Sequence, residues 1–219
     1  MKKTSLTLLS LAIVLLLPVA VKAYSAQSGA SVYVPKTETI EGSLYAAGQN
    51  ITVEGRVKGD VICAGQTINI KGVVDGDVIC AGQTINVDSK IGGNLRTAGS
   101  FINIDGSIAR NVMAFGATIN TAASSTIGSD MLVGAALAEI RGKISRDLYG
   151  GGSSIIIGGQ VDKNIKLSLE DGNYGKNKDD KNNASGLVID KGAKIGGNLE
   201  YSAYKDATID KGAKITGKI

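Results

Sequence analysis

The stretch that decides the fold is GDVICAGQTINIKGVVD at Gly59–Asp75, which is followed at once by GDVICAGQTINVDSKIG at Gly76–Gly92. The two segments have 17 residues each and are identical over their first eleven positions. Outward from them, the same pattern begins again at Gly42, Gly93, Arg110, Ser129 and Arg146. Only the repeat at Arg110 is longer, by two residues. Seven consecutive repeats of this length predict a solenoid in which each repeat forms one coil.

Each repeat contains three stretches whose apolar residues point to one side. The third position is apolar throughout, the tenth and twelfth are apolar in most repeats, as in Ile68 and Ile70, and another apolar residue comes near the end, as in Val74. The third position holds Leu44, Val61, Val78, Leu95, Val112, Met131 and Leu148. Because side chains alternate between the faces of a strand, this spacing predicts short strands with one buried face. Three such stretches predict a triangular coil.

Glycines separate the stretches, at position seven in Gly65 and Gly82 and at position fourteen in Gly72. Glycine permits the tight or left-handed backbone that a corner needs. We expect each strand to pair in parallel and in register with the equivalent strand of the next repeat. The fold class is therefore all-β, a single-stranded parallel β-helix with about 17 residues per coil. Parallel connections are generally right-handed, and roughly nine coils would form a rod about 40 Å long.

The N-terminus has the pattern of a signal peptide, which we assign to residues 1–23. Lys2 and Lys3 precede an apolar stretch from Leu6 to Ala20, and small residues around Ala23 offer a cleavage site. An uncleaved membrane anchor is the alternative, but the apolar stretch is shorter than the ~20 residues of a spanning helix. We therefore expect an exported protein of the cell envelope, the cell surface or the secreted fraction.

The rest of the chain divides into a lead-in and a repeat domain. Residues 24–41 are expected to form an N-terminal lead-in or cap, and residues 42–219 the β-helix. Within the β-helix, residues 170–186 (EDGNYGKNKDDKNNASG) are polar and predict a solvated loop inserted into a coil. The pattern resumes after this loop, where the heptapeptide IDKGAKI occurs twice.

The charge balance argues against a nucleic-acid partner. The leader contains Lys2, Lys3 and Lys22 and no acidic residue, so removing it from the 24 basic residues leaves 21 against 20 acidic ones. Nucleic-acid binding needs clustered positive charge, and aromatic residues for stacking make up only 4% of the chain.

Two columns of residues are candidate chemical sites. The second position of the repeat carries Asp60, Asp77, Asn94, Asn111, Asp130 and Asp147. Neighbouring carboxylates at this position offer a cation site, but Asp and Asn are also ordinary turn residues whose stacked side chains form hydrogen-bonded ladders. We favour the ladder and predict no metal or cofactor, because the column includes asparagines and runs along the whole rod without defining one site. We also predict no catalytic residue, since the chain has no histidine to serve as a general base.

Cys63 and Cys80 occupy the same inward position in adjacent repeats. Their expected separation lies within the range of a disulfide, but parallel Cβ directions make the bond geometry awkward. We expect a column of two buried thiols, with a disulfide as the alternative.

The repeat itself resembles that of the bactofilins, the polymer-forming cytoskeletal proteins of bacteria. The resemblance rests on glycine or arginine followed by Asp or Asn and an apolar residue, as in GDVICAG, GNLRTAG and RNVMAFG, and it covers roughly residues 40 to 216. It implies a scaffold whose β-helices polymerise end to end without nucleotide. Bactofilins are typically cytoplasmic, whereas this chain has an export leader, and the insertion at 170–186 interrupts a coil that is usually continuous.

These observations favour a structural protein over an enzyme. The expected function is an exported scaffold or polymer subunit whose partner is a second copy of itself, with envelope or membrane-associated proteins as further partners. Self-association is expected through the C-terminal coil, around Ile209 and Ile215. The alternative is a binding module for polysaccharide, peptidoglycan or protein that uses the faces of the rod. An outward apolar stripe at the fourth position favours protein or lipid over sugar, and it comprises Tyr45, Ile62, Ile79, Arg96, Met113, Leu132 and Tyr149.

Overall fold

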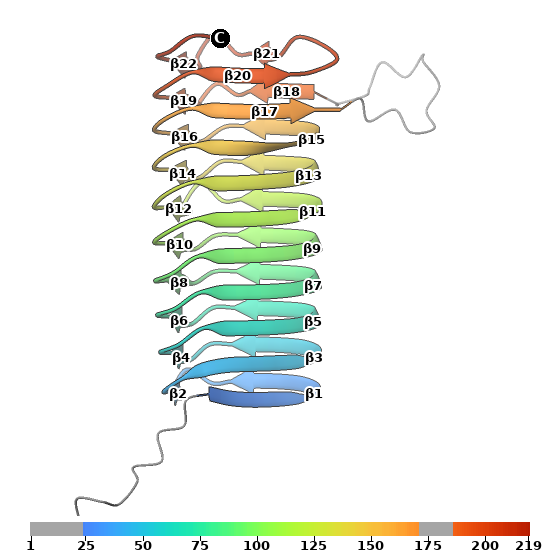
Figure 1. Ribbon diagram of the computed structural model, residues 1–219, viewed down its shortest axis with the longest axis vertical. Helices are drawn as coiled ribbons and strands as arrows, with labels where there is room; N and C mark the ends of the chain where they lie inside the picture. Colours follow the sequence, from blue (N-terminus) through green and yellow to red (C-terminus); the bar gives the residue numbers. More distant parts are fainter. Residues whose placement is uncertain (1–23, 171–185) are drawn as a thin grey trace, which may run out of the picture.

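Figure 1 shows the computed structural model of the chain, which describes residues 24–170 and 186–219. All regular structure in these segments is strand, and they contain no helix that is long and apolar enough to cross a membrane. The expected signal peptide at 1–23 lies outside the described residues, as do residues 171–185 of the expected loop.

The strands form two parallel sheets, one of 12 strands and one of 10. The larger sheet contains β1 (Tyr24–Val34), β3 (Ser43–Val53), β5 (Val61–Ile70), β7 (Val78–Val87), β9 (Leu95–Ile104), β11 (Val112–Thr121), β13 (Met131–Ile140), β15 (Leu148–Ile157), β17 (Ile165–Leu169), β18 (Gly186–Ile189), β20 (Leu199–Ser202) and β21 (Thr208–Ile209). The smaller sheet contains β2 (Thr39–Ile40), β4 (Arg56–Val57), β6 (Val73–Val74), β8 (Lys90–Ile91), β10 (Ser107–Ile108), β12 (Thr126–Ile127), β14 (Lys143–Ile144), β16 (Gln160–Val161), β19 (Lys194–Ile195) and β22 (Lys214–Ile215). Each coil has one short strand, so the described chain forms ten coils.

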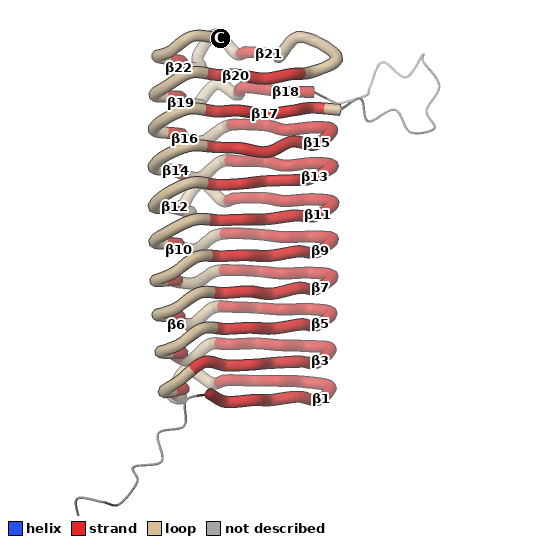
Figure 2. Tube along the Cα trace, viewed as in Figure 1, coloured by secondary structure: helices blue, strands red, loops and turns tan. Residues whose placement is uncertain are grey.

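The expected fold class is confirmed. Equivalent residues of successive repeats pair directly, so that Val61 lies opposite Val78 and Ile68 opposite Ile85. In Figure 1 the chain runs from left to right on the near side of the rod, returns on the far side and rises from β1 toward the C-terminus. This path makes the coil right-handed. Figure 2 shows that the long strands bend around one edge without a break, whereas turns form the opposite edge.

The bend within each long strand divides it into two faces of the triangle. On β5, Val61 and Cys63 are buried before the bend, and Ile68 and Ile70 after it, so the alternation changes phase between Cys63 and Ile68. The side chains of all three faces meet in one apolar core that extends along the rod. The short strands supply the third face, with Val57 and Val74 buried.

The glycine at the bend is required by close approach of adjacent coils. A Cβ atom on Gly82 would lie 2.5 Å from the carbonyl oxygen of Gly65, which is closer than real Cβ contacts come. The expected left-handed backbone is not found at this position, since only Gly29, Gly150 and Gly186 have positive φ in the described chain. The corner therefore selects glycine for space, because the coils stack at strand spacing.

One expected boundary changes, that of the N-terminal segment. Residues 24–41 are not a separate lead-in, because β1 pairs in register with β3 and β2 with β4, so that they form the first coil. The polar insertion starts after β17 ends at Leu169, at the corner where other long strands bend. The coil continues beyond it, since β15 pairs with β17 through its first half and with β18 through its second half.

Candidate functional site: the ladders, the front face and the ends of the rod

A polar column of aspartate and asparagine runs along one corner of the rod. In this column the side-chain oxygen of each residue accepts a hydrogen bond from the backbone N–H of the equivalent residue in the next coil. The backbone N–H of Asp77, for example, donates to Asp60 Oδ1 at 2.8 Å. The column consists of Ser43, Asp60, Asp77, Asn94, Asn111, Asp130, Asp147, Asn164 and Asn198, and Ser43 contributes its hydroxyl oxygen. The predicted ladder is therefore confirmed, and its oxygens are engaged along the whole rod.

Asp77 accepts hydrogen bonds from both a neighbour in the polar column and an arginine. Its Oδ1 accepts the Asn94 backbone N–H at 2.8 Å, and its Oδ2 accepts a hydrogen bond from Arg96 at 2.7 Å. Burial raises the pKa of the Asp77 carboxyl, but the hydrogen bonds from Asn94 and Arg96 outweigh burial and hold the pKa below its usual value. The carboxylate is thus a stabilised acceptor. No group of three His, Cys, Asp or Glu side chains in the described segments is arranged to hold a metal ion.

A second ladder connects asparagine side chains on the far side of the rod. The amide of Asn86 donates to Asn69 Oδ1 at 2.9 Å, and that of Asn103 donates to Asn86 Oδ1 at 2.9 Å. Asn120 extends the row by donating to Asn103 at 3.1 Å. Because the amides donate and accept along the rod axis, this ladder is also a structural feature.

Cys63 and Cys80 are joined by a disulfide, with their Cα atoms 4.6 Å apart. The prediction of two buried thiols is therefore wrong, and the alternative that we ranked second is observed. The inward orientation was predicted correctly, since the two residues are 5% and 3% exposed. In-register pairing places equivalent positions of adjacent coils at strand spacing, which lies within reach of a disulfide.

The outward stripe at the fourth position lies on the front face, which we define as the first halves of the long strands, nearest the viewer in Figure 1. Tyr45, Ile79, Met113 and Tyr149 are exposed there. Small residues between the large ones leave shallow hollows, one of which is lined by Ile62, Ile79, Met113 and Phe115. Arg96 is the charged member of the predicted stripe, and its charge is offset by Asp77.

Sequence reasoning missed two aromatic residues of the front face. Tyr24 precedes the first recognised repeat, yet it packs edge-on against Tyr45, with ring centroids 6.0 Å apart. Phe115 is 44% exposed and stands at the sixth position, which carries alanine in the preceding repeats. The register of the repeat contains the signal for Phe115, because the sixth position has the same outward orientation as the fourth.

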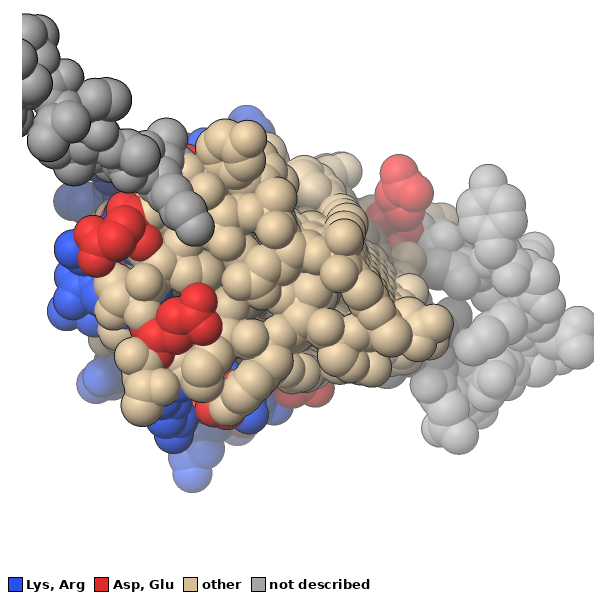
Figure 3. Space-filling model, turned by 90° about the horizontal axis from the view of Figure 1, so that it is seen from below, with Lys and Arg blue, Asp and Glu red and all other residues tan. Residues whose placement is uncertain are grey.

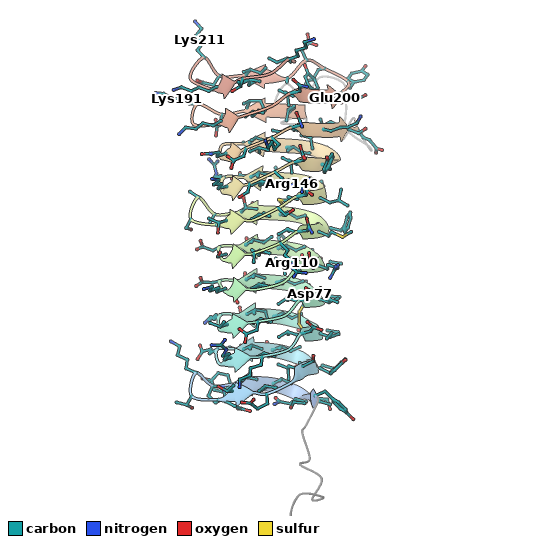
Figure 4. All side chains as sticks on the ribbon, turned by 60° about the vertical axis from the view of Figure 1, so that its left-hand side comes forward. Asp77, Arg110, Arg146, Lys191, Glu200 and Lys211 are labelled. Carbon is teal, nitrogen blue, oxygen red and sulfur yellow. A yellow bond between two sulfur atoms is a disulfide. The ribbon has the colours of Figure 1, made fainter. Side chains whose placement is uncertain are left out.

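Charged side chains gather on the short-strand side of the rod, as Figure 3 shows from the N-terminal end. Ion pairs there connect adjacent coils: Arg56 lies 2.9 Å from Asp75, Lys58 lies 2.7 Å from Glu41, and Lys143 lies 3.1 Å from Asp162. Figure 4 shows that Lys191 and Lys211 project from the same corner of the last two coils. Exposed pairs of this kind contribute little stability, so their main effect is on which surfaces attract each other.

The two ends of the rod differ in what they expose. At the C-terminal end Ile209 is 37% exposed and Ile215 is half-buried. At the N-terminal end the equivalent apolar residues Val34 and Ile40 are buried, but the outer edge of β1 has no partner strand in the described chain. The proposed contact through Ile209 and Ile215 remains a prediction.

Comparisons of the chain with models of protein families, with curated proteins and with solved structures give no match.

Proposed function

We propose that the protein is a non-enzymatic structural subunit, exported to the cell envelope, which assembles by end-to-end stacking of its β-helix. Its principal partner in this proposal is a second copy of the chain. The repeat resemblance to bactofilins supports an exported variant of that polymer-forming family. The Cys63–Cys80 disulfide supports export, because disulfides persist chiefly in oxidising compartments.

One observation carries the proposal: the strand ladder keeps the same register through all ten coils. The column that begins at Ile40 on β2 ends at Ile215 on β22, and the column through Val34 on β1 ends at Ile209 on β21. The columns of the short strands and of the second halves of the long strands therefore run from the first coil to the last. The outer edges of the first and last coils carry backbone N–H and C=O groups that pair readily with another strand edge.

Electron microscopy of the purified protein tests this function. Negative-stain images should show filaments of rod width that lengthen as the protein concentration rises. Dispersed short rods at every concentration would contradict the proposal.

A pair of variants locates the contact surface. Replacing Ile209 and Ile215 with lysine puts charge into the proposed C-terminal contact, whereas Ile79→Lys puts it on the front face. Ile79 is a matched control for Ile209, since the two are 42% and 37% exposed. Light scattering should show smaller assemblies for the first variant alone, and circular dichroism should show that both variants stay folded. If Ile79→Lys gives smaller assemblies and the Ile209 and Ile215 variant does not, the contact lies on the front face.

A second candidate function is binding of another envelope protein by the front face. The exposed tyrosines and aliphatic residues between Tyr45 and Tyr149 favour it, because a contiguous apolar patch is typical of a protein interaction site. In that case Ile79→Lys should abolish capture of an envelope protein without changing filament length.

A further inference from the structure

The second halves of the long strands form a face whose chemistry differs from that of the front face, and we call it the amide face. It consists of the outward side chains of β3 to β11 beyond the bend, on the side of the rod that lies behind the front face in Figure 1. These strands present Asn50, Thr52, Thr67, Asn69, Thr84, Asn86, Phe101, Asn103, Thr118 and Asn120. All of these side chains except Phe101 are asparagine or threonine, and none carries a charge.

Hydrogen bonds between coils hold the amides of this face in place. The asparagine ladder described above runs from Asn69 to Asn120, and Gln66 donates to Gln83 Oε1 at 3.2 Å beside the bend. An amide has two N–H donors and an oxygen with two lone pairs, so the ladder leaves each inner amide one donor and one lone pair. These groups repeat at the strand spacing of about 4.8 Å. Because the ladder fixes their orientation, a ligand loses less entropy in ordering them.

Two exposed aromatic rings stand among these polar side chains. Phe101 is 50% exposed, and its ladder partners on the two sides are Thr84 and Thr118. Tyr33 of β1 is 56% exposed at the N-terminal end of the asparagine column, and its hydroxyl donates to Glu54 at 3.0 Å. The strand order places the two rings four coils apart, which is about 19 Å along the rod. Rings so exposed bury little of their apolar surface in the rod and are free to stack on a ligand.

This combination of groups fits a neutral sugar polymer. The hydroxyl groups of a sugar both donate and accept hydrogen bonds, as the amides do, and the C–H groups on one side of a sugar ring pack on an aromatic face. A charged ligand would find no counter-charge among these side chains. We propose that the amide face binds an extended, uncharged polysaccharide along the rod axis, with a sugar ring stacked on Phe101 and hydroxyl groups bonded to Asn86 and Asn103.

A protein partner fits the amide face less well than a polysaccharide does. Protein interfaces are centred on clusters of apolar and aromatic side chains, whereas Phe101 stands alone among threonines and asparagines. The front face has such a cluster, so the two faces suit ligands of different chemistry. Binding on the amide face leaves the ends of the rod free and does not depend on the proposed assembly.

Affinity electrophoresis of the full chain tests the proposal. Native gels that contain hydroxyethyl cellulose, glycol chitin or glucomannan should retard the wild-type protein in at least one case, relative to a gel without polysaccharide. A gel that contains the polyanion alginate should not retard it. Retardation by none of the three neutral polymers, or equal retardation by alginate, would overturn the proposal.

Two variants locate the binding surface. Phe101→Thr removes the ring and installs the residue of the neighbouring repeats, so the rod should stay folded. It should raise the Kd for the neutral polymer about five- to ten-fold. Asn86→Ala removes one amide of the ladder and should raise the Kd about two- to five-fold. Circular dichroism checks that both variants keep their β structure.

Phe115→Ala is the matched control on the front face. Phe115 is 44% exposed, and its partner in the preceding coil is Ala98, so this change also installs the residue of a neighbouring repeat. It should leave the Kd unchanged. If Phe101→Thr binds the polymer no more weakly than Phe115→Ala, the amide face is not the site. Neither result bears on filament formation, so this proposal and the proposed assembly can fail separately.

Discussion

Replacing one buried isoleucine with alanine should destabilise the rod far more than replacing an exposed isoleucine on the same strand. Ile85 and Ile79 both lie on β7, but Ile85 is 0% exposed and Ile79 is 42% exposed. Ile85 also packs in line with Ile68 below it and Ile102 above it, so its side chain is enclosed along the rod axis.

The expected magnitude follows from the apolar volume removed. Ile85→Ala loses roughly three buried carbon atoms, which at about 0.8 kcal/mol each amounts to about 2.4 kcal/mol. The cavity left between rigid coils adds to this, so we expect a loss of about 3–4 kcal/mol in the free energy of unfolding. Ile79→Ala leaves no enclosed cavity, and its expected loss is below about 1 kcal/mol.

Denaturant unfolding followed by circular dichroism measures the difference, and thermal melts should show a fall of roughly 6–16 °C for Ile85→Ala in a chain of this length. Equal losses for the two variants would refute the assignment of inside and outside on β7. A larger loss for Ile79→Ala would mean that the front face is covered in solution.

Three further effects are expected. Reducing the Cys63–Cys80 disulfide, or replacing both residues with alanine, should lower the free energy of unfolding by about 3 kcal/mol, as measured by denaturant titration with and without reductant, because the bond closes a loop with a sequence separation of 17. Asp77→Asn should lower the melting temperature at neutral pH, because the lowered pKa of Asp77 stabilises the fold above the ordinary aspartate pKa. That stability is lost in the wild type as pH falls through the lowered pKa, so the difference in melting temperature between wild type and variant should narrow below about pH 4. Asn94→Ala removes the acceptor of the Asn111 backbone N–H and should cost about 1 kcal/mol in a denaturant melt.

The repeat predicts most of the fold because each residue of a coil pairs with the equivalent residue of the next coil. When Ile68 pairs with Ile85 and Gly65 with Gly82, one correct assignment of inside and outside extends to every coil. The first coil was missed because β1 (YSAQSGASVYV) has the polar residues Ser25 and Gln27 opposite Leu44 and Ala46 of the next coil. Only the corner glycine Gly29 and the apolar residues after it keep the pattern of the other repeats.

The disulfide was misjudged for a different physical reason. Sequence fixes only that Cys63 and Cys80 share a position, whereas bonding depends on local side-chain geometry between two coils. Phe115 and Tyr24 also contribute to the front face, although no repeat-wide pattern marks them. Single residues that depart from a repeat are thus the least predictable part of the candidate site.

The polar insertion begins after β17 ends at Leu169, at a corner, and the extra residues of the repeat at Arg110 also lie at a corner, between β11 and β12. The longer repeat forms a turn in which Ser125 donates its N–H to the carbonyl of Ala122, between β11 and β12. Added length at a corner leaves the three faces in register, because the residues that pair between coils are unchanged. The column of the short strands therefore runs without a shift from Ile40 to Ile215, and this continuity is what the proposed end-to-end stacking relies on.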